Sequence, residues 1–252
     1  MRFAFFLMLF VTFATSAEVS LIHKKYSGYE TWIDCSKRSL ALVSYVVKAD
    51  YHNEKVDREF HFDQSIPEEC RQKSTSTYRS PKETSYHRGH MVPYNHMDFS
   101  VLAQHESNIM TANILPQTST LNTGAWLVSE EYVECQRDKL KGDLGESLYG
   151  VAVMAGPLYE GEPDTRFMKS HGIQTPTGYF KVAIAGSAYG IDETKAWIMP
   201  NSFDATKEMA DTYLVSIKEV EKRSGFSWNL PEAEKIKVAK SSYSTVQNCR
   251  LD

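Results

Sequence analysis

Four cysteines spread along the chain set the strongest limit on how it can fold. They stand far apart in the sequence, at Cys35, Cys70, Cys135 and Cys249. Two disulfide bonds are the default interpretation in an exported chain, and they would tie distant segments together. A zinc site is the alternative, but the cysteines form no Cys-x-x-Cys pair and do not cluster at the spacing of zinc ligands. The sequence allows three disulfide pairings and does not choose among them.

The N-terminus predicts export. Met1 and Arg2 precede an apolar run over residues 3–13, and small residues follow over 14–17. A membrane anchor is the alternative, but a helix that spans a bilayer needs about 20 apolar residues, and this run is shorter. The pattern is typical of a secretory signal peptide at 1–17, with cleavage after Ala17. We expect a soluble mature protein that is secreted or periplasmic.

The remaining chain is expected to form a single domain over residues 18–252. About 235 residues are enough for one large domain with a well-buried core. Glycine and proline are scattered, and the sequence contains neither a low-complexity run nor a repeat of fixed period.

Hydrophobic periodicity predicts a mixed α+β fold. Helical spacing begins near residue 121 and continues through Cys135, and a second helix is expected over 205–223, ending near Gly225. Strands are expected at 39–47, 58–62, 148–155, 179–185 and 196–199.

A run of polar residues in the middle of the chain suits phosphodiester chemistry. His87, Arg88 and His90 lie just over thirty positions before Asn122, and Glu130 follows Asn122 by eight residues. Histidine is a general base near neutral pH, and arginine is a fixed cation for phosphate. A single asparagine with a water-bridged glutamate suits Mg²⁺, which prefers oxygen ligands and keeps several waters. Together these residues predict a one-metal phosphodiesterase site.

The surrounding sequence resembles the DNA/RNA non-specific endonuclease family. The resemblance implies an α+β fold with a central antiparallel sheet and a ββα-metal (His-Me finger) unit at the active site. The family motif usually begins with Asp-Arg-Gly-His, whereas His87 stands at the Asp position here. The likeness extends roughly from residue 58 to residue 230 and is carried by residues 112–117, 121–126, 130, 155–159, 176–182, 198–201 and 215–225.

The resemblance implies a role for each polar residue of the motif. His90 would be the general base that deprotonates water for in-line attack on phosphorus. Asn122 would bind Mg²⁺ directly, with Mn²⁺ as a substitute, and Glu130 would hold the metal through water. Arg88 and Arg58 would hold phosphate oxygens. The products would carry 5′-phosphates.

Three further positions are expected to support this site. Asn113 and Gln117 would fix the loop that carries Asn122, and His87 would neighbour the water shell of the metal. Other interpretations remain open for single residues: His87, His90 and His96 could bind zinc, Asn122 could cap a helix, and Glu130 could lie on a solvated helix face.

Local charge favours a polyanionic substrate more than total charge does. The formal net charge of −4 becomes about −5 after loss of Arg2. Between residues 71 and 90, however, five Lys or Arg residues accompany one acid, Glu83. A solvated basic loop is the alternative.

The expected substrates are DNA and RNA, cleaved without sequence preference. The sequence contains no recognition helix, zinc finger or stacking platform that would read bases. Phosphate contacts carry affinity without base information. A narrower phosphodiesterase and an exported nucleic-acid-binding protein with a degenerate site are the alternatives.

Overall fold

A seven-stranded antiparallel sheet forms the centre of the fold. The computed structural model describes residues 11–13, 20–48, 54–79, 85–139, 149–187, 190–247 and 249. Across the sheet the strands follow the order β10 (Leu214–Val215), β9 (Gly190–Pro200), β8 (Gly178–Ser187), β7 (Tyr149–Leu158), β4 (Ser39–Val47), β3 (Tyr29–Asp34) and β2 (Leu21–Lys25).

A separate pair of strands carries the histidine motif. β5 (Tyr86–His90) pairs antiparallel with β6 (Ile114–Thr118). β6 leads directly into α3 (Ser119–Thr123) and α4 (Ala125–Lys139), which completes the predicted ββα unit. The other elements are β1 (Val11–Phe13), η1 (Glu68–Cys70), η2 (Tyr94–Met97), α1 (Val101–Glu106), α2 (Met110–Asn113), η3 (Ala210–Tyr213), α5 (Ile217–Ser224), β11 (Phe226–Trp228), α6 (Glu232–Lys235) and α7 (Tyr243–Gln247).

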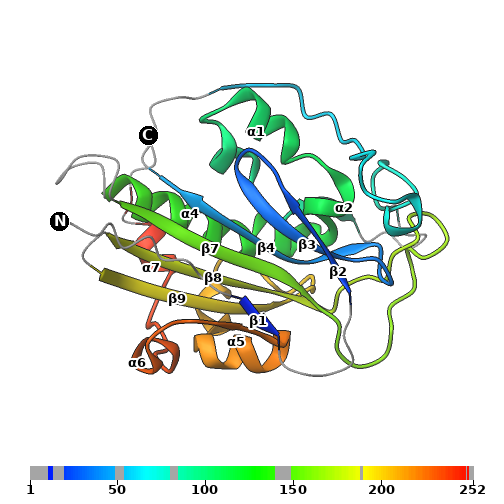
Figure 1. The fold of residues 1–252 in the computed structure, drawn as a ribbon. Helices are drawn as coiled ribbons and strands as arrows, with labels where there is room; N and C mark the ends of the chain where they lie inside the picture. The colour runs from blue at the N-terminus through cyan, green and yellow to red at the C-terminus, as the bar shows by residue number, and fades with distance from the viewer. Residues whose placement is uncertain are drawn as a thin grey trace.

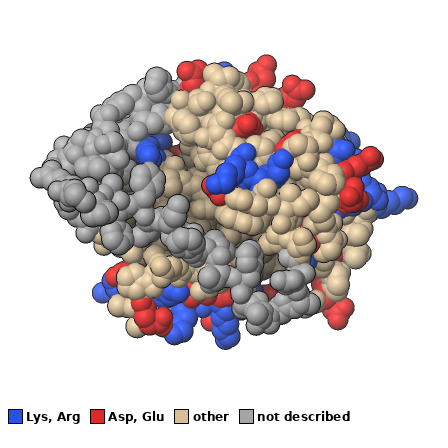
Figure 2. All heavy atoms as spheres, viewed as in Figure 1, with Lys and Arg blue, Asp and Glu red and all other residues tan. Residues whose placement is uncertain are grey.

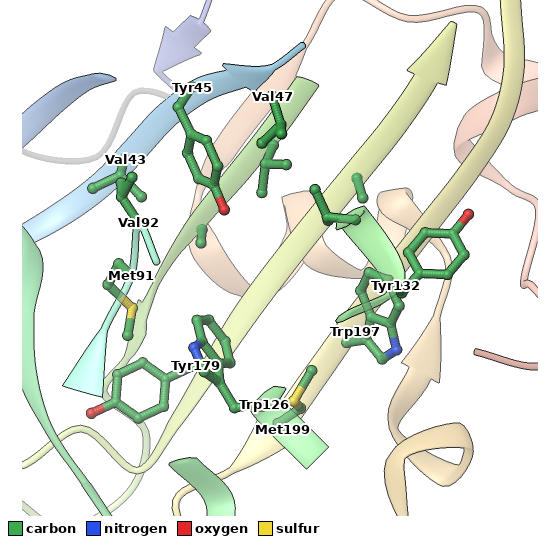
Figure 3. Close-up of a cluster of buried hydrophobic side chains, with 14 of the residues drawn as sticks. Val43, Tyr45, Val47, Met91, Val92, Trp126, Tyr132, Tyr179, Trp197 and Met199 are labelled. Carbon is green, nitrogen blue, oxygen red and sulfur yellow. The ribbon is translucent and has the colours of Figure 1, made fainter. Parts of the chain in front are cut away.

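Helices cover both faces of the large sheet (Figure 1). On one face, Trp126 and Tyr132 of α4 pack edge-on against Tyr179 and Trp197 of the sheet, with ring centroids 5.7 and 5.5 Å apart (Figure 3). On the other face, α5 and β11 form a second core. Alternate residues of β8 point into these two cores, because side chains of a strand alternate between faces. A strand buried on both faces is apolar along its whole length, as β8 nearly is.

Four of the five predicted strands are confirmed, and the one at 58–62 is wrong. Residues 39–47 form β4, and the predictions at 148–155, 179–185 and 196–199 overlap β7, β8 and β9. Among the described residues, the segment 58–62 makes a single bridge, between His61 and Ile109. Phe60 and Phe62 pack against a small core that includes Tyr86. Their alternation therefore reflects burial of two rings and not pairing with a strand.

The helix predicted from residue 121 is interrupted at Gly124. α3 ends at Thr123, and α4 begins at Ala125. A Cβ atom on Gly124 would lie 2.3 Å from the carbonyl oxygen of Thr120 and 2.5 Å from that of Ala205. The Ala205 carbonyl also accepts a hydrogen bond from Ala125 N, at 3.1 Å. The break thus occurs where another part of the chain crosses the helix start.

The second helix is shorter than predicted. Instead of 205–223 it spans Ile217–Ser224, because the preceding residues form η3 and β10. The side chain of Ser216 accepts a hydrogen bond from Glu219 N and caps the helix. Gly225 ends the helix in the left-handed conformation, with φ of 76°, as the sequence predicts.

The cysteines form two pairs at disulfide distance. Cys35 joins Cys70, and Cys135 joins Cys249. The first pair ties η1 to the sheet beyond β3, and the second ties residue 249, near the C-terminus, to α4. Within the described ranges, the helices are too short or too polar to cross a bilayer.

Most of the predicted signal peptide lies outside the described residues. Residues 1–10 and 14–17 belong to the parts of the chain that the structure leaves undescribed. Val11–Phe13 forms β1, antiparallel to β11. Cleavage after Ala17 therefore stays a prediction, and it would remove β1 from the mature protein.

Candidate active site

His90 is the last residue of β5, and hydrogen bonds hold it on two sides. Its Nε2 lies 3.1 Å from Asn108 Oδ1, and its backbone carbonyl accepts a hydrogen bond from the indole of Trp126, at 3.1 Å. The Nδ2 of Asn108 donates to the carbonyl of Gln104, so Oδ1 is the atom that faces His90. Nε2 therefore donates, and Nδ1 keeps the lone pair that a general base needs.

The surroundings of His90 favour its neutral form. Burial lowers the pKa of His90 to about 4, while its hydrogen bond with Asn108 opposes this shift. The charges of Arg58 and Arg88 lower the pKa further. A neutral imidazole at neutral pH can accept a proton, whereas an imidazolium cannot.

Two arginines lie near the histidine. The guanidinium of Arg88 stacks 3.8 Å from the ring centroid of Phe60 and donates to the carbonyl of Thr75, at 2.9 Å. Arg58 is exposed and lies 4.5 Å from the ring centroid of Tyr94. The ring of Phe60 also lies 5.7 Å from that of His90. These aromatic contacts fix the directions of both cations, which suits binding of a phosphate group.

Asn122 lies on α3 and contacts the start of β5. Its amide Nδ2 donates to His87 Nδ1 at 3.2 Å, so its Oδ1 is the atom that a hard cation would take. Thr118 caps α3 by accepting a hydrogen bond from Leu121 N, so the helix-cap interpretation of Asn122 is wrong. His87 and His90 are three residues apart on a strand, a separation of about 10 Å. Asn122 thus lies against the start of β5, whereas His90 stands at its end.

Glu130 is placed differently from the sequence expectation. The interruption at Gly124 means that Asn122 and Glu130 do not lie on one continuous helix. The carboxylate is largely buried, with 17% of the side chain exposed, so the interpretation as a solvated residue is wrong. Its Oε1 lies 4.0 Å from Nζ of Lys181. Burial raises the pKa of Glu130 to about 7, and the charge of Lys181 opposes that shift.

The predicted supporting residues act on β5 more than on the loop of Asn122. Asn113 accepts from Val92 N at 2.6 Å and donates to its carbonyl at 2.9 Å, so it fixes the chain just after His90. Gln117 is fully buried beneath Gly89. A Cβ atom at Gly89 would lie 2.2 Å from Gln117 Oε1, so the two strands need a glycine there.

The donor set suits a hard cation better than zinc. Within the described residues, no group of three or more His, Cys, Asp or Glu side chains could hold a metal. His96 is buried elsewhere, 3.3 Å from the hydroxyl of Tyr45 and 3.5 Å from Glu134 Oε1. One amide oxygen completed by waters fits Mg²⁺, which dehydrates reluctantly.

Four residues near this site could not be predicted from the sequence alone. Asn108, Phe60 and Tyr94 stand in segments without a recognisable motif, and only the fold brings them to His90 and the arginines. Lys181 occupies an apolar strand, and an isolated charge there was the one available signal.

Charge on the molecule is mixed. Figure 2 shows lysine and arginine side chains together with acidic ones on the same face. Attraction of a polyanion would therefore depend on local groups such as Arg58 and Arg88 and not on the overall field.

Comparison with known proteins places the chain in a family. Mitochondrial Endonuclease G of Bos taurus is 27% identical over 176 residues, covering 66% of this chain and 54% of that protein. The Nuclease of Serratia marcescens is 33% identical over 146 residues, covering 55% of this chain and 48% of that protein. The chain thus spans about half the length of these curated relatives.

A solved structure and a family model give the same result as these relatives. A crystal structure of the EndoG/EndoGI complex shares the fold, with a TM-score of 0.64 at 22% identity, covering 84% of this chain and 88% of that chain. Residues 10–233 match the family model described as DNA/RNA non-specific endonuclease. Since this match spans most of the sequence, the chain belongs to the DNA/RNA non-specific endonuclease family.

Proposed function

We propose that this protein is an endonuclease that hydrolyses phosphodiester bonds of DNA and RNA without sequence preference. The observation that carries the proposal is the arrangement at the end of β5, where Asn108 holds His90 and the charges of Arg88 and Arg58 lie near it. A fixed base beside two cations can activate water next to a bound phosphate.

Each residue has one proposed task. His90 accepts the proton of the attacking water at Nδ1, because Nε2 is committed to Asn108. Arg88 and Arg58 bind and orient phosphate oxygens, as bidentate cations do. Charge then develops on the phosphate next to groups that are already in place, which lowers the barrier.

A divalent cation completes the proposed site. Asn122 would hold Mg²⁺ or Mn²⁺ through Oδ1, and Glu130 would hold it through water. When bound, the cation supplies positive charge to the scissile phosphate and a water that protonates the leaving 3′ oxygen, which gives 5′-phosphate products. His87 keeps the side chain of Asn122 oriented by accepting its Nδ2 proton.

Export and a single mature domain over 18–252 are part of the proposal. The cysteine pairs suit an oxidising compartment, and the N-terminal run suits a signal peptide. Secreted or periplasmic placement follows from both.

Cleavage assays with purified mature protein test the proposal. In Mg²⁺ we expect conversion of supercoiled plasmid DNA to short fragments and degradation of RNA, and in EDTA we expect no activity. DNA ligase joins only ends that carry 5′-phosphates, so we expect it to join the products. Cleavage of only a small diester would indicate the narrower phosphodiesterase. Binding of nucleic acid without cleavage in Mg²⁺ or Mn²⁺ would contradict the proposal and indicate a degenerate site.

A further inference from the structure

We propose that Lys181 is a positioning residue that holds the carboxylate of Glu130 in place beneath the active site. This inference rests on the proposed function, because Glu130 is the residue assigned to the metal's waters. It adds a residue of the central sheet to the site.

The position of Lys181 is unusual for a lysine. It lies on β8, on the face that α4 covers, and its side chain is fully buried. Its alternate neighbours on that face, Tyr179 and Ala183, belong to the hydrophobic core. Nζ has no hydrogen-bond partner among the described residues. Burial of a charge without hydrogen bonds is costly, so a role outside stability would explain a lysine where the fold needs an apolar side chain.

Two contacts connect the ammonium group with the active site. Nζ lies 4.0 Å from Glu130 Oε1 and 3.9 Å from the ring centroid of Trp126. Trp126 and Glu130 are four residues apart on α4 and thus share one face of the helix. The indole of Trp126 in turn donates to the backbone carbonyl of His90. Lys181 therefore contacts the carboxylate of Glu130 directly. It also contacts the ring of Trp126, which supports the backbone of His90.

Glu134, the next acid along the same face of α4, is the competing partner. Its Oε1 lies 3.5 Å from Nε2 of the buried His96, so it already faces another group. Glu130 is the carboxylate with a close contact to Lys181 in the described structure. The geometry thus assigns the cation to Glu130.

Lys181→Met tests the inference, and Lys195→Met is a matched control. Lys195 is also buried, lies 4.6 Å from the ring centroid of Tyr132 on α4, and pairs with Glu193 instead of Glu130. We expect Lys181→Met to lower kcat about 10- to 100-fold with little change in KM, as for removal of a residue that orients a metal's surroundings. Lys195→Met should keep the wild-type kcat.

A double-mutant cycle with Glu130→Gln separates positioning from general packing. If Lys181 acts through Glu130, the variant Lys181→Met/Glu130→Gln should have the same kcat as Glu130→Gln alone. The double variant also removes both charges, so it should fold even if Lys181→Met does not. A kcat tenfold or more below that of Glu130→Gln would overturn the inference. The same cycle with Glu134→Gln should be additive, and coupling to Glu134 instead of Glu130 would equally overturn it.

Binding of Mn²⁺ provides a readout that does not need turnover. Electron paramagnetic resonance titration should show weaker Mn²⁺ binding in Lys181→Met than in the wild type and no change in Lys195→Met. An unchanged Mn²⁺ affinity together with an unchanged kcat would refute the role of Lys181. An inactive wild-type protein would instead refute the proposed function, and the Mn²⁺ titration would still decide the question for Lys181.

Discussion

His90 acquires its chemical character from neighbours that are distant in sequence. Asn108 fixes one tautomer, and burial keeps the ring neutral where an exposed histidine would begin to charge. At neutral pH the ring is thus neutral, the form that the proposed role as proton acceptor requires.

This environment predicts a pH dependence of stability. Because the folded pKa of His90 is near 4 and the ordinary value is 6.5, the unfolded chain binds a proton between these values and the folded chain does not. The contribution is complete above about pH 6.5 and is lost as pH falls towards 4. Between pH 7 and pH 5 we expect the wild type to lose about 2 kcal/mol more unfolding free energy than His90→Gln. Urea unfolding at both pH values measures this, and equal losses in the two proteins would contradict it.

Position 87 of the motif is expected to tolerate an aspartate in place of His87. A carboxylate at this place could also accept the Nδ2 proton of Asn122, so His87→Asp preserves the contact that orients the proposed metal ligand. We expect plasmid cleavage in Mg²⁺ at least comparable to that of the wild type. Complete loss of cleavage by a folded His87→Asp protein would show that the motif alignment is misleading.

The site could be predicted only as far as its local motif extends. His90, Asn122 and Glu130 follow from residue types and spacing, whereas Asn108 and Lys181 do not, because tertiary contacts alone bring them to the site. The continuous helix between Asn122 and Glu130 was predicted wrongly, since a period of apolar residues cannot reveal a chain that crosses at Gly124.

Secondary structure can likewise be predicted only where the apolar pattern is strong. The buried strands β4, β7, β8 and β9 have strong apolar patterns and were predicted. The edge strand β2 is only partly buried, and its sequence includes two lysines, so its pattern is weak. The segment 58–62 has a strand-like alternation but lacks a strand to pair with.

At the α3–α4 junction, a single substitution at Gly124 is expected to lower both stability and activity. In Gly124→Ala the new Cβ would clash with the carbonyl oxygens of Thr120 and Ala205, which must move. We expect a loss of about 1–3 kcal/mol of unfolding free energy, with a shift of α3 that lowers kcat/KM.

Ser216→Ala is the control for this variant, because it removes the cap of α5 at a cost of about 1 kcal/mol and leaves α3 intact. Its kcat/KM should equal that of the wild type. Equal kcat/KM values in the wild type and Gly124→Ala would show that the junction does not position Asn122.

The molecule as a whole is a sheet with helices on both faces (Figure 1). Two disulfide bonds cross-link it. The pair Cys35–Cys70 joins the residue after β3 to η1, and the pair Cys135–Cys249 joins α4, the helix that carries Glu130, to residue 249. One of the two covalent ties therefore holds the helix that carries Glu130. Each tie would add about 2–4 kcal/mol by restricting the unfolded chain.

Export and disulfide formation predict the covalent state of the mature protein. Mass spectrometry should find Glu18 at the N-terminus, no free thiol, and peptides that link Cys35 to Cys70 and Cys135 to Cys249. Four reactive thiols in freshly exported protein would contradict both the pairing and the proposed compartment.

The division of labour between His90 and Asn122 is the central claim for the whole enzyme, and a Mg²⁺ titration of cleavage tests it most directly. His90→Ala should bind metal nearly as the wild type does, with turnover lower by a factor of roughly 10² to 10⁴ at every Mg²⁺ concentration. Asn122→Ala should regain part of its activity at high Mg²⁺, because mass action can overcome weak binding but cannot replace a missing proton acceptor. Rescue of His90→Ala by Mg²⁺, with Asn122→Ala inert throughout, would contradict the assignment.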